Sequence, residues 1–72
     1  MFQNFFEAAK EAYLKALALE PHRVDVLSDL GTAYLRLKRF EEAKVTFEKA
    51  LHLQPDHVLS QRRLQELSKL FH

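Results

Sequence analysis

The sequence predicts an all-α fold in which four antiparallel helices form a stack of helix-turn-helix units. Three observations lead to this prediction. The 72 residues include only one glycine and two prolines, and residues that favour helices are frequent. Apolar residues recur with the spacing of one helical face. Finally, the chain repeats itself after 34 residues, a period typical of stacked helical repeats.

The repeat is visible as identical residues at matching positions. The first copies are Phe6, Glu7, Ala9, Lys10, Lys15, Ala16, Leu17, Leu19, Pro21 and Val24. The second copies are Phe40, Glu41, Ala43, Lys44, Lys49, Ala50, Leu51, Leu53, Pro55 and Val58. Repeats of this kind usually provide surfaces for partners rather than catalytic clefts. We therefore expect a single domain spanning 1–72.

Length and composition limit the classes of function. A chain of 72 residues buries only about 60% of the surface that its unfolded form exposes, and it has no room for a cavity between two lobes. The absence of cysteine excludes disulfides and cysteine-based zinc sites, and it is compatible with the cytoplasm, where we expect the protein. A net charge of +1 argues against a nucleic-acid partner held by phosphate neutralisation.

We expect neither a membrane partner nor a signal peptide. No apolar stretch approaches the roughly 20 residues that span a bilayer. The segment 1–6 is apolar, but it lacks both a basic region and the small residues of a cleavage site.

The first helix is predicted over 2–19. Its apolar residues share one helical face and are Phe2, Phe5, Phe6, Ala9, Tyr13, Ala16 and Leu17. Pro21 ends the helix, because the residue before a proline is pushed out of helical dihedral angles.

The second helix is predicted over 24–37. Asp25 lies near its start and Arg36 near its end, where each charge is favoured by the helix dipole. Its apolar face is Leu27, Leu30, Gly31, Tyr34 and Leu37. A glycine inside a helix costs about 1 kcal/mol relative to alanine. The close approach of another helix would offset that cost.

The third helix is predicted from Phe40 or Glu41 to Leu53, and Pro55 closes it as Pro21 closes the first. Its inner face is Phe40, Ala43, Phe47, Ala50 and Leu51. We expect Ala43 to lie against Gly31, because two small residues let the axes of the two helices come together.

The fourth helix is predicted over 57–70, with Asp56 as its N-cap. Val58, Leu64, Leu67, Leu70 and Phe71 are expected to cover the third helix. The remaining positions are mostly polar.

Segment 24–57 resembles one complete tetratricopeptide repeat. The resemblance rests on Leu27, Leu30, Gly31, Tyr34, Ala43, Phe47 and Pro55, which stand at the spacing of that repeat, with leucine where tryptophan is most typical. Residues 1–21 then resemble the second helix of a partial, preceding repeat. Residues 58–72 resemble the first helix of a following one and form a capping helix. The resemblance implies a fragment of an α-solenoid that interacts with other proteins.

Two departures from the family pattern carry expectations. Lys38 and Arg39 occupy a turn where the family often has glycine and aspartate. A lysine at positive φ costs roughly 1–2 kcal/mol, so we expect a different turn. In the fourth helix, Gln61, Gln65 and Ser68 stand in the places of Leu27, Gly31 and Tyr34. This end of the stack is therefore predicted to be closed to further helices.

The phenylalanine-rich first helix permits three interpretations. Its residues Phe2, Phe5, Phe6, Ala9 and Tyr13 lie on or beside a face that, in the family, contacts a helix absent from this chain. The three phenylalanines can fold back onto the second and third helices as ordinary core. They can form an exposed patch that pairs two copies in a homodimer. Or the chain is a fragment whose upstream helix covers them.

The resemblance also implies a place for a ligand. Tetratricopeptide arrays bind peptides on the concave surface lined by the first helix of each repeat. The implied residues are Asp25, Ser28, Asp29, Thr32 and Arg36, joined by Leu59, Arg62, Arg63 and Glu66. The first group is mainly acidic and the second mainly basic, so a peptide of mixed charge suits the surface. The alternative is an ordinary solvated helix face.

We expect no enzyme, cofactor or metal site. The histidines are His22, His52, His57 and His72, and none is spaced as a helical metal pair. The hydroxyl residues Ser28, Ser60, Ser68, Thr32 and Thr46 have no evident base and orienting acid. The predicted function is a scaffold that binds a protein or peptide. The alternative is a self-associating structural module, either a repeat fragment or an engineered repeat.

Overall fold

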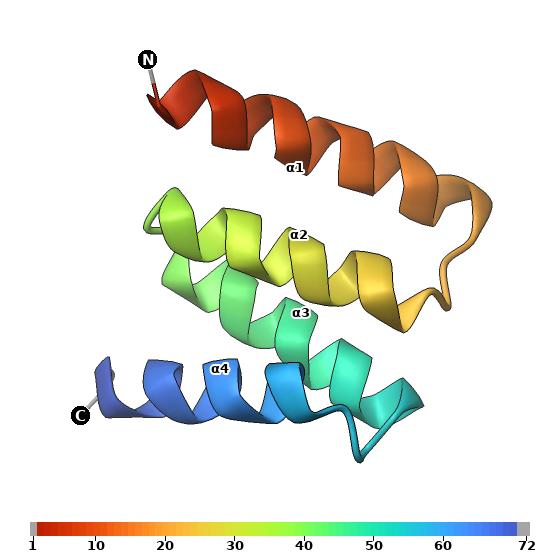
Figure 1. Ribbon diagram of the computed structural model, residues 1–72, viewed down its shortest axis with the longest axis vertical. Coiled ribbons are helices and arrows are strands. Elements are labelled where there is room, and N and C mark those ends of the chain that lie inside the picture. The colour runs from red at the N-terminus through yellow and green to blue at the C-terminus, as the bar shows by residue number, and fades with distance from the viewer. Residues whose placement is uncertain (1, 71–72) are drawn as a thin grey trace.

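The predicted all-α fold of four helices is confirmed. The computed structural model describes the backbone of residues 2–70 and the side chains of residues 5–70. The helices are α1 (Phe2–Leu19), α2 (Val24–Arg36), α3 (Phe40–Leu53) and α4 (Val58–Leu70), and the described residues contain no strand (Figure 1). The side chains of Phe2, Phe71 and His72, for which the sequence analysis makes predictions, lie outside the described residues.

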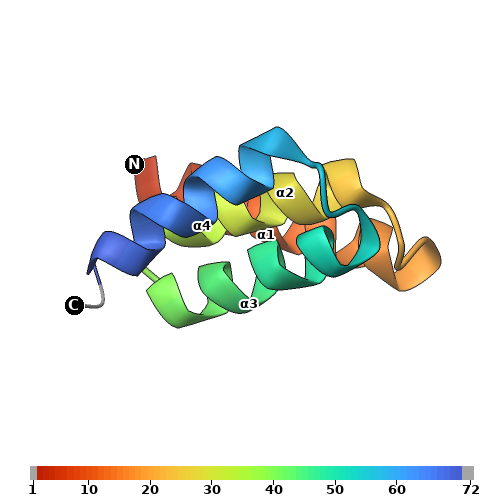
Figure 2. The same cartoon turned by 90° about the horizontal axis from the view of Figure 1, so that it is seen from below.

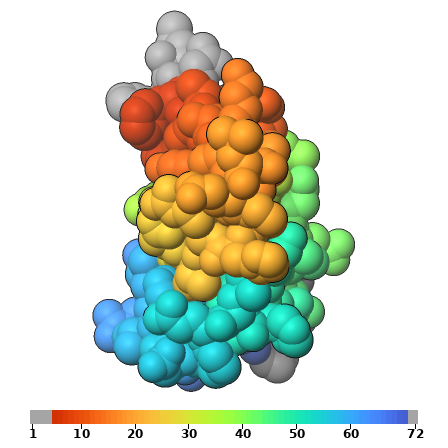
Figure 3. Space-filling model, turned by 90° about the vertical axis from the view of Figure 1, so that its right-hand side faces the viewer, coloured from red at the N-terminus to blue at the C-terminus, as the bar shows by residue number. Residues whose placement is uncertain are grey.

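The helices form a flattened stack of 28 × 28 × 16 Å. α2 lies at its centre and contacts α1, α3 and α4, and α3 also contacts α4. Figure 2 shows α3 on one side of the molecule and α2 with α4 on the other. The two turns that contain proline lie at the same edge, which Figure 3 shows in space-filling form with α1 at the top and α4 at the bottom.

The core lies between α2, α3 and α4. Its buried side chains are Leu30, Tyr34, Ala43, Phe47 and Leu67, and partly buried residues pack around them: Tyr13, Leu17, Leu35, Phe40 and Leu64. Ala43, Phe47 and Ala50 are fully buried. The apolar faces predicted for the second and third helices are thus the faces that the structure buries.

The neighbour of Gly31 differs from the predicted one. A Cβ atom built on Gly31 would lie 2.7 Å from two ring atoms of Phe47, and the three nearest atoms all belong to that ring. The expected partner, Ala43, is not among them. The space left by the missing side chain is therefore filled by a large ring from one turn further along α3, rather than by a second small residue.

The turn between α2 and α3 also corrects an expectation. Lys38 has a φ of 62°, so it adopts the left-handed conformation that glycine adopts most readily. The backbone N–H of Lys38 donates to Leu35, and that of Arg39 donates to Tyr34, at 3.0 and 2.9 Å. These two bonds form a Schellman motif, which stabilises the left-handed residue and offsets its cost.

The start of α4 is capped by a residue other than the predicted one. Gln61 N–H donates to the carbonyl of His57, and the N–H of Ser60 donates to His57 Nδ1 at 3.3 Å. His57 is therefore the N-cap, and the prediction of Asp56 is wrong by one position. The ring nitrogen takes the acceptor role that a side-chain oxygen has in most caps.

Only part of the predicted apolar face of α4 is buried. Leu67 is 1% exposed and Leu64 packs against the core, as predicted. Val58 and Leu70 are 62% and 63% exposed, so the two ends of the predicted apolar face are not buried. Ser60, which the sequence analysis does not assign to the core, is completely buried. The buried residues of α4 thus lie near both of its ends, at Ser60 and Leu67, while Val58 and Leu70 at its two termini remain exposed.

Candidate functional site: a hollow between the first two helices

The two predicted functional surfaces meet in one hollow. Its volume is about 110 Å³, and its lining comes from two neighbouring helices. α1 contributes Phe5, Phe6, Ala9 and Tyr13, and α2 contributes Asp29, Thr32 and Ala33. The α1 residues were predicted as a self-association patch, and Asp29 and Thr32 were predicted as ligand contacts. Ala33 was not predicted, because its position in the sequence suits the core equally well.

Helical spacing explains why these residues share the hollow. Phe6, Ala9 and Tyr13 lie three and four positions apart and form one stripe along α1. Asp29, Thr32 and Ala33 form the corresponding stripe on α2. The ring of Phe5 meets that of Phe6 edge-on, with centroids 5.1 Å apart and an interplanar angle of 77°. Phe5 is 66% exposed, whereas Phe6, Ala9 and Tyr13 are half-buried.

The internal repeat shows that the face of α1 with Ala9 and Tyr13 lacks a covering helix among the described residues. Ala9 and Tyr13 correspond, after a shift of 34 residues, to Ala43 and Phe47, which are fully buried under α2. In the described residues no helix covers α1 in the way that α2 covers α3. Tyr13 and Leu17 pack on the core. Of the phenylalanines interpreted as ordinary core, Phe5 is 66% exposed and is not part of the core, while Phe6 is half-buried.

The two acidic residues of α2 differ in their surroundings. Arg23 donates to Asp25 from both Nε and Nη2, at 3.3 and 2.6 Å, and also to Glu20. The hydrogen bonds from Arg23 hold the pKa of Asp25 below its usual range. Asp29, at the rim of the hollow, forms no ion pair with any described residue. Its carboxylate is therefore available to a charged ligand.

The remaining residues predicted to contact a ligand differ in solvent exposure. Arg36, Leu59 and Arg62 are exposed, and α2 and α4 are in contact, so these residues lie on adjoining helices. Arg63 is half-buried and donates to Glu66 at 3.2 Å. Ser28 is only 2% exposed, so its placement on an open surface is wrong. Its small side chain lies on the side of α2 that faces the interior.

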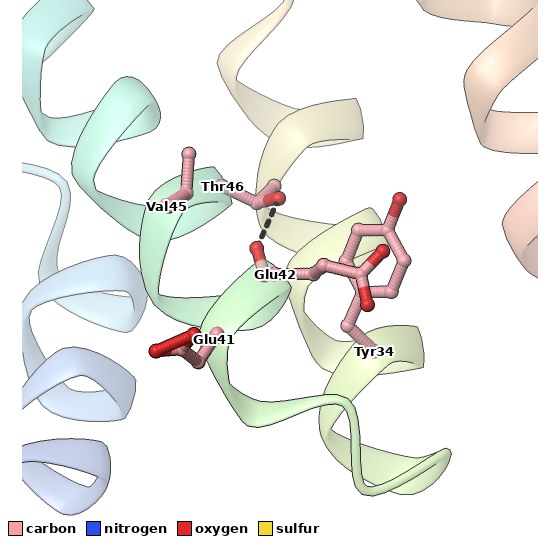
Figure 4. A pocket seen from close by; sticks show the side chains of 5 residues that line it. All are labelled: Tyr34, Glu41, Glu42, Val45 and Thr46. Atoms are coloured by element: carbon pink, nitrogen blue, oxygen red, sulfur yellow. Dashed lines mark hydrogen bonds between the residues drawn. The ribbon is translucent and has the colours of Figure 1, made fainter.

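A second hollow lies where α2 and α3 meet (Figure 4). It measures about 320 Å³ and is lined by Tyr34, Glu41, Glu42, Val45 and Thr46. Arg39 forms two hydrogen bonds to the carboxylate of Glu42, at 2.7 and 2.9 Å, and its guanidinium lies 5.6 Å from the centre of the Tyr34 ring. Thr46 donates to the carbonyl of Glu42 at 2.7 Å. The groups around Glu42 are thus occupied with one another and hold the α2–α3 turn.

A third hollow, of about 300 Å³, lies at the other end of the stack. Its lining is Leu51, Gln61, Leu64, Gln65 and Ser68. Three of these are the polar residues that were predicted to close this end to further helices. The two ends of the stack therefore differ in character, with aromatic side chains at the α1 end and amides and a hydroxyl at the α4 end.

One serine–histidine pair was missed by the sequence analysis. The hydroxyl of Ser60 lies 2.9 Å from His57 Nδ1, so Ser60 has a neighbouring base, although no carboxylate of the described residues is hydrogen-bonded to that histidine. The sequence contains a signal for this pair, because His57 and Ser60 stand three residues apart at the predicted start of a helix, as the two side chains of a capping pair do. However, Ser60 is completely buried, and the same nitrogen accepts the Ser60 N–H. The pair has no access to a substrate and caps the helix.

Within residues 2–70, no group of three or more histidine, cysteine, aspartate or glutamate side chains is placed to hold a metal ion. Over the same part of the chain, no helix combines the length and the apolar content that crossing a bilayer requires.

Comparison with known proteins gives one family and one relative. A family model described as tetratricopeptide repeat matches residues 3–67. The human protein O-mannosyl-transferase TMTC3 is 45% identical over 53 residues, which cover 72% of this chain and 6% of that protein. The chain thus corresponds to a short part of this relative. No solved structure matches the chain.

Proposed function

Because the chain belongs to the tetratricopeptide repeat family, we propose that it is an interaction module that binds a peptide or protein on the surface of α2 and α4. Members of this family generally bind proteins or peptides and are typically non-catalytic scaffolds. The proposal is therefore for a binding role, without transferase activity of its own. A cytoplasmic location is part of the proposal, supported only by the cysteine-free composition.

The hollow beside α2 is the observation that carries the proposal. It places an apolar wall from α1 next to Asp29 and Thr32. The exposed Arg36 and Arg62 add positive charge on α2 and α4. A surface that combines an apolar recess with charges of both signs can fix the register of a bound peptide, because charge patterns steer partners and the recess supplies contact area.

Selection from a displayed library of random peptides would test the proposal. We expect enriched peptides to lose binding when Arg62→Glu reverses a charge on the proposed surface. Glu48→Lys is the matched control, because Glu48 is an exposed residue of α3, outside this surface. The proposal fails if no peptide is enriched, or if the control variant weakens binding as much as Arg62→Glu does.

A second candidate function is self-association through α1. The observation in its favour is the 66% exposure of Phe5 beside the half-buried Ala9 and Tyr13. Burying a phenylalanine side chain is worth about 1.5–3 kcal/mol, so pairing two such faces would be favourable. A homodimer with two-fold symmetry would cover both patches at once.

Light scattering at high micromolar concentration would test this second candidate. We expect a dimer mass for the unmodified chain and a monomer mass for Phe5→Gln. Val45→Gln is the matched control, because Val45 is similarly exposed, at 62%, but lies on α3. A monomer mass for the unmodified chain would remove this candidate and leave the first one untouched.

A further inference from the structure

We infer that the hollow between α1 and α2 receives one cationic side chain of the partner, with arginine preferred over lysine, and that Asp29 is its counter-charge. This inference rests on the proposed binding function and names the chemistry of the bound group. It depends on three features of the hollow, which are its size, the nature of its walls and the single carboxylate at its rim.

The size of the hollow admits a side chain but not a helix. Its volume of about 110 Å³ is several times the minimum of about 10–15 Å³ that a single water molecule needs. That space accommodates the end of one long side chain. A second helix would have to cover the hollow from outside and leave its interior to a residue that projects from it.

The walls favour a cation on an apolar stem. Phe5, Phe6 and Tyr13 supply aromatic surface, and Ala9 and Ala33 supply methyl groups. Aromatic faces attract guanidinium and ammonium groups, arginine more often than lysine. Arginine and lysine also bury their methylene stems along apolar surface while the charged end remains near water. Thr32 also lines the hollow, and its hydroxyl proton is already donated to the Ser28 carbonyl at 3.1 Å.

The carboxylate of Asp29 selects the sign of the charge. It forms no ion pair with a described residue, in contrast to Asp25, which Arg23 holds with two hydrogen bonds. A neutral apolar group in the hollow would remove water from Asp29 without giving it a partner, which costs free energy. A guanidinium avoids this cost and can engage both oxygens of the carboxylate in its planar, forked geometry.

Two small molecules of matched shape would test the inference on the full chain. The probes are n-butylguanidinium and its neutral counterpart n-butylurea, titrated into isotope-labelled protein and followed by amide chemical shifts in NMR at physiological ionic strength. We expect saturable shifts at Asp29, Thr32 and Ala33 with the guanidinium, and binding at least about fivefold weaker with the urea. Equal binding of the two probes would overturn the inference.

Matched variants identify the counter-charge. Asp29→Asn keeps the shape of the side chain and removes its charge, so we expect it to reduce guanidinium binding to the level of the urea. Glu48→Gln removes an exposed carboxylate of α3, outside the hollow, and we expect no change. The inference is wrong if both variants weaken binding equally. It is also wrong if light scattering shows a dimer in which the hollow no longer accepts the probe.

The outcomes separate this inference from the function on which it rests. Peptides that bind without an arginine preference, and that bind Asp29→Asn unchanged, would refute the inference and leave the binding function intact. Binding of the guanidinium at Asp29 without any enriched peptide would refute the peptide-binding function and leave the cation site intact.

Discussion

The ring of Phe47 lies directly on the backbone of Gly31, where a Cβ atom would be only 2.7 Å from Cε1 and Cζ of the ring. Two terms therefore compete at position 31. Alanine would favour the helix by about 1 kcal/mol. The overlap with a fully buried ring acts in the opposite direction, and overpacking of this kind costs typically 1–3 kcal/mol.

Gly31→Ala is therefore expected to lower the free energy of unfolding, by up to about 2 kcal/mol once the helix term is subtracted. Urea denaturation followed by circular dichroism would measure it. A double-mutant cycle with Phe47→Leu supplies the control, because in the smaller-residue background Gly31→Ala should be neutral or stabilising. A single variant that is more stable than the unmodified chain would contradict the packing argument.

Lys38→Gly is expected to stabilise the chain by about 1 kcal/mol, because glycine adopts the left-handed conformation without the steric cost that lysine has. The φ of 62° at Lys38 makes this position suitable. Thermal unfolding would show the effect as a higher melting temperature. Lys44→Gly is the matched control, since Lys44 is an exposed lysine inside α3 and its replacement should destabilise by a similar amount.

His57→Ala is expected to destabilise α4 by about 0.5–2 kcal/mol, because it removes the acceptor for the N–H of Ser60. His57→Asn should retain most of the stability, since asparagine is a good N-cap. Amide hydrogen exchange in the first turn of α4 would report the loss most directly. His22→Ala is the control. His22 lies in the exposed turn between α1 and α2, so its replacement should have no effect on α4. Equal protection in His57→Ala would show that the cap is irrelevant.

The ion pair at the start of α2 predicts a dependence on pH. Arg23 lowers the pKa of Asp25 in the folded chain, so the pair stabilises the fold above the ordinary carboxyl pKa of about 3.9. This contribution is lost as the pH falls through the lowered pKa of Asp25. NMR titration of the carboxyl carbons should show Arg23→Gln raising the pKa of Asp25 toward its usual range. Arg62→Gln should leave that pKa unchanged, and no response to Arg23→Gln would refute the pairing.

Local physical chemistry determined the helices and most of their inward faces. α1 and α3 each end two residues before a proline, Pro21 and Pro55, because proline disfavours helical geometry at the residue before it. The spacing of Leu30, Tyr34 and Phe47 was enough to identify the core. Helical periodicity fixes which residues share a face, and the repeat of 34 residues identified how such faces stack.

Only the tertiary structure decided which atoms fill each face and which surfaces meet. The contact of Gly31 with Phe47, rather than Ala43, depends on how α2 and α3 cross, and periodicity along one helix carries no information on crossing. For the same reason, the sequence predicted the aromatic stripe of α1 and the carboxylate of Asp29 as parts of two separate surfaces. The packing of α1 on α2 brings them into one hollow, and Ser28, one turn before Thr32 on α2, is buried.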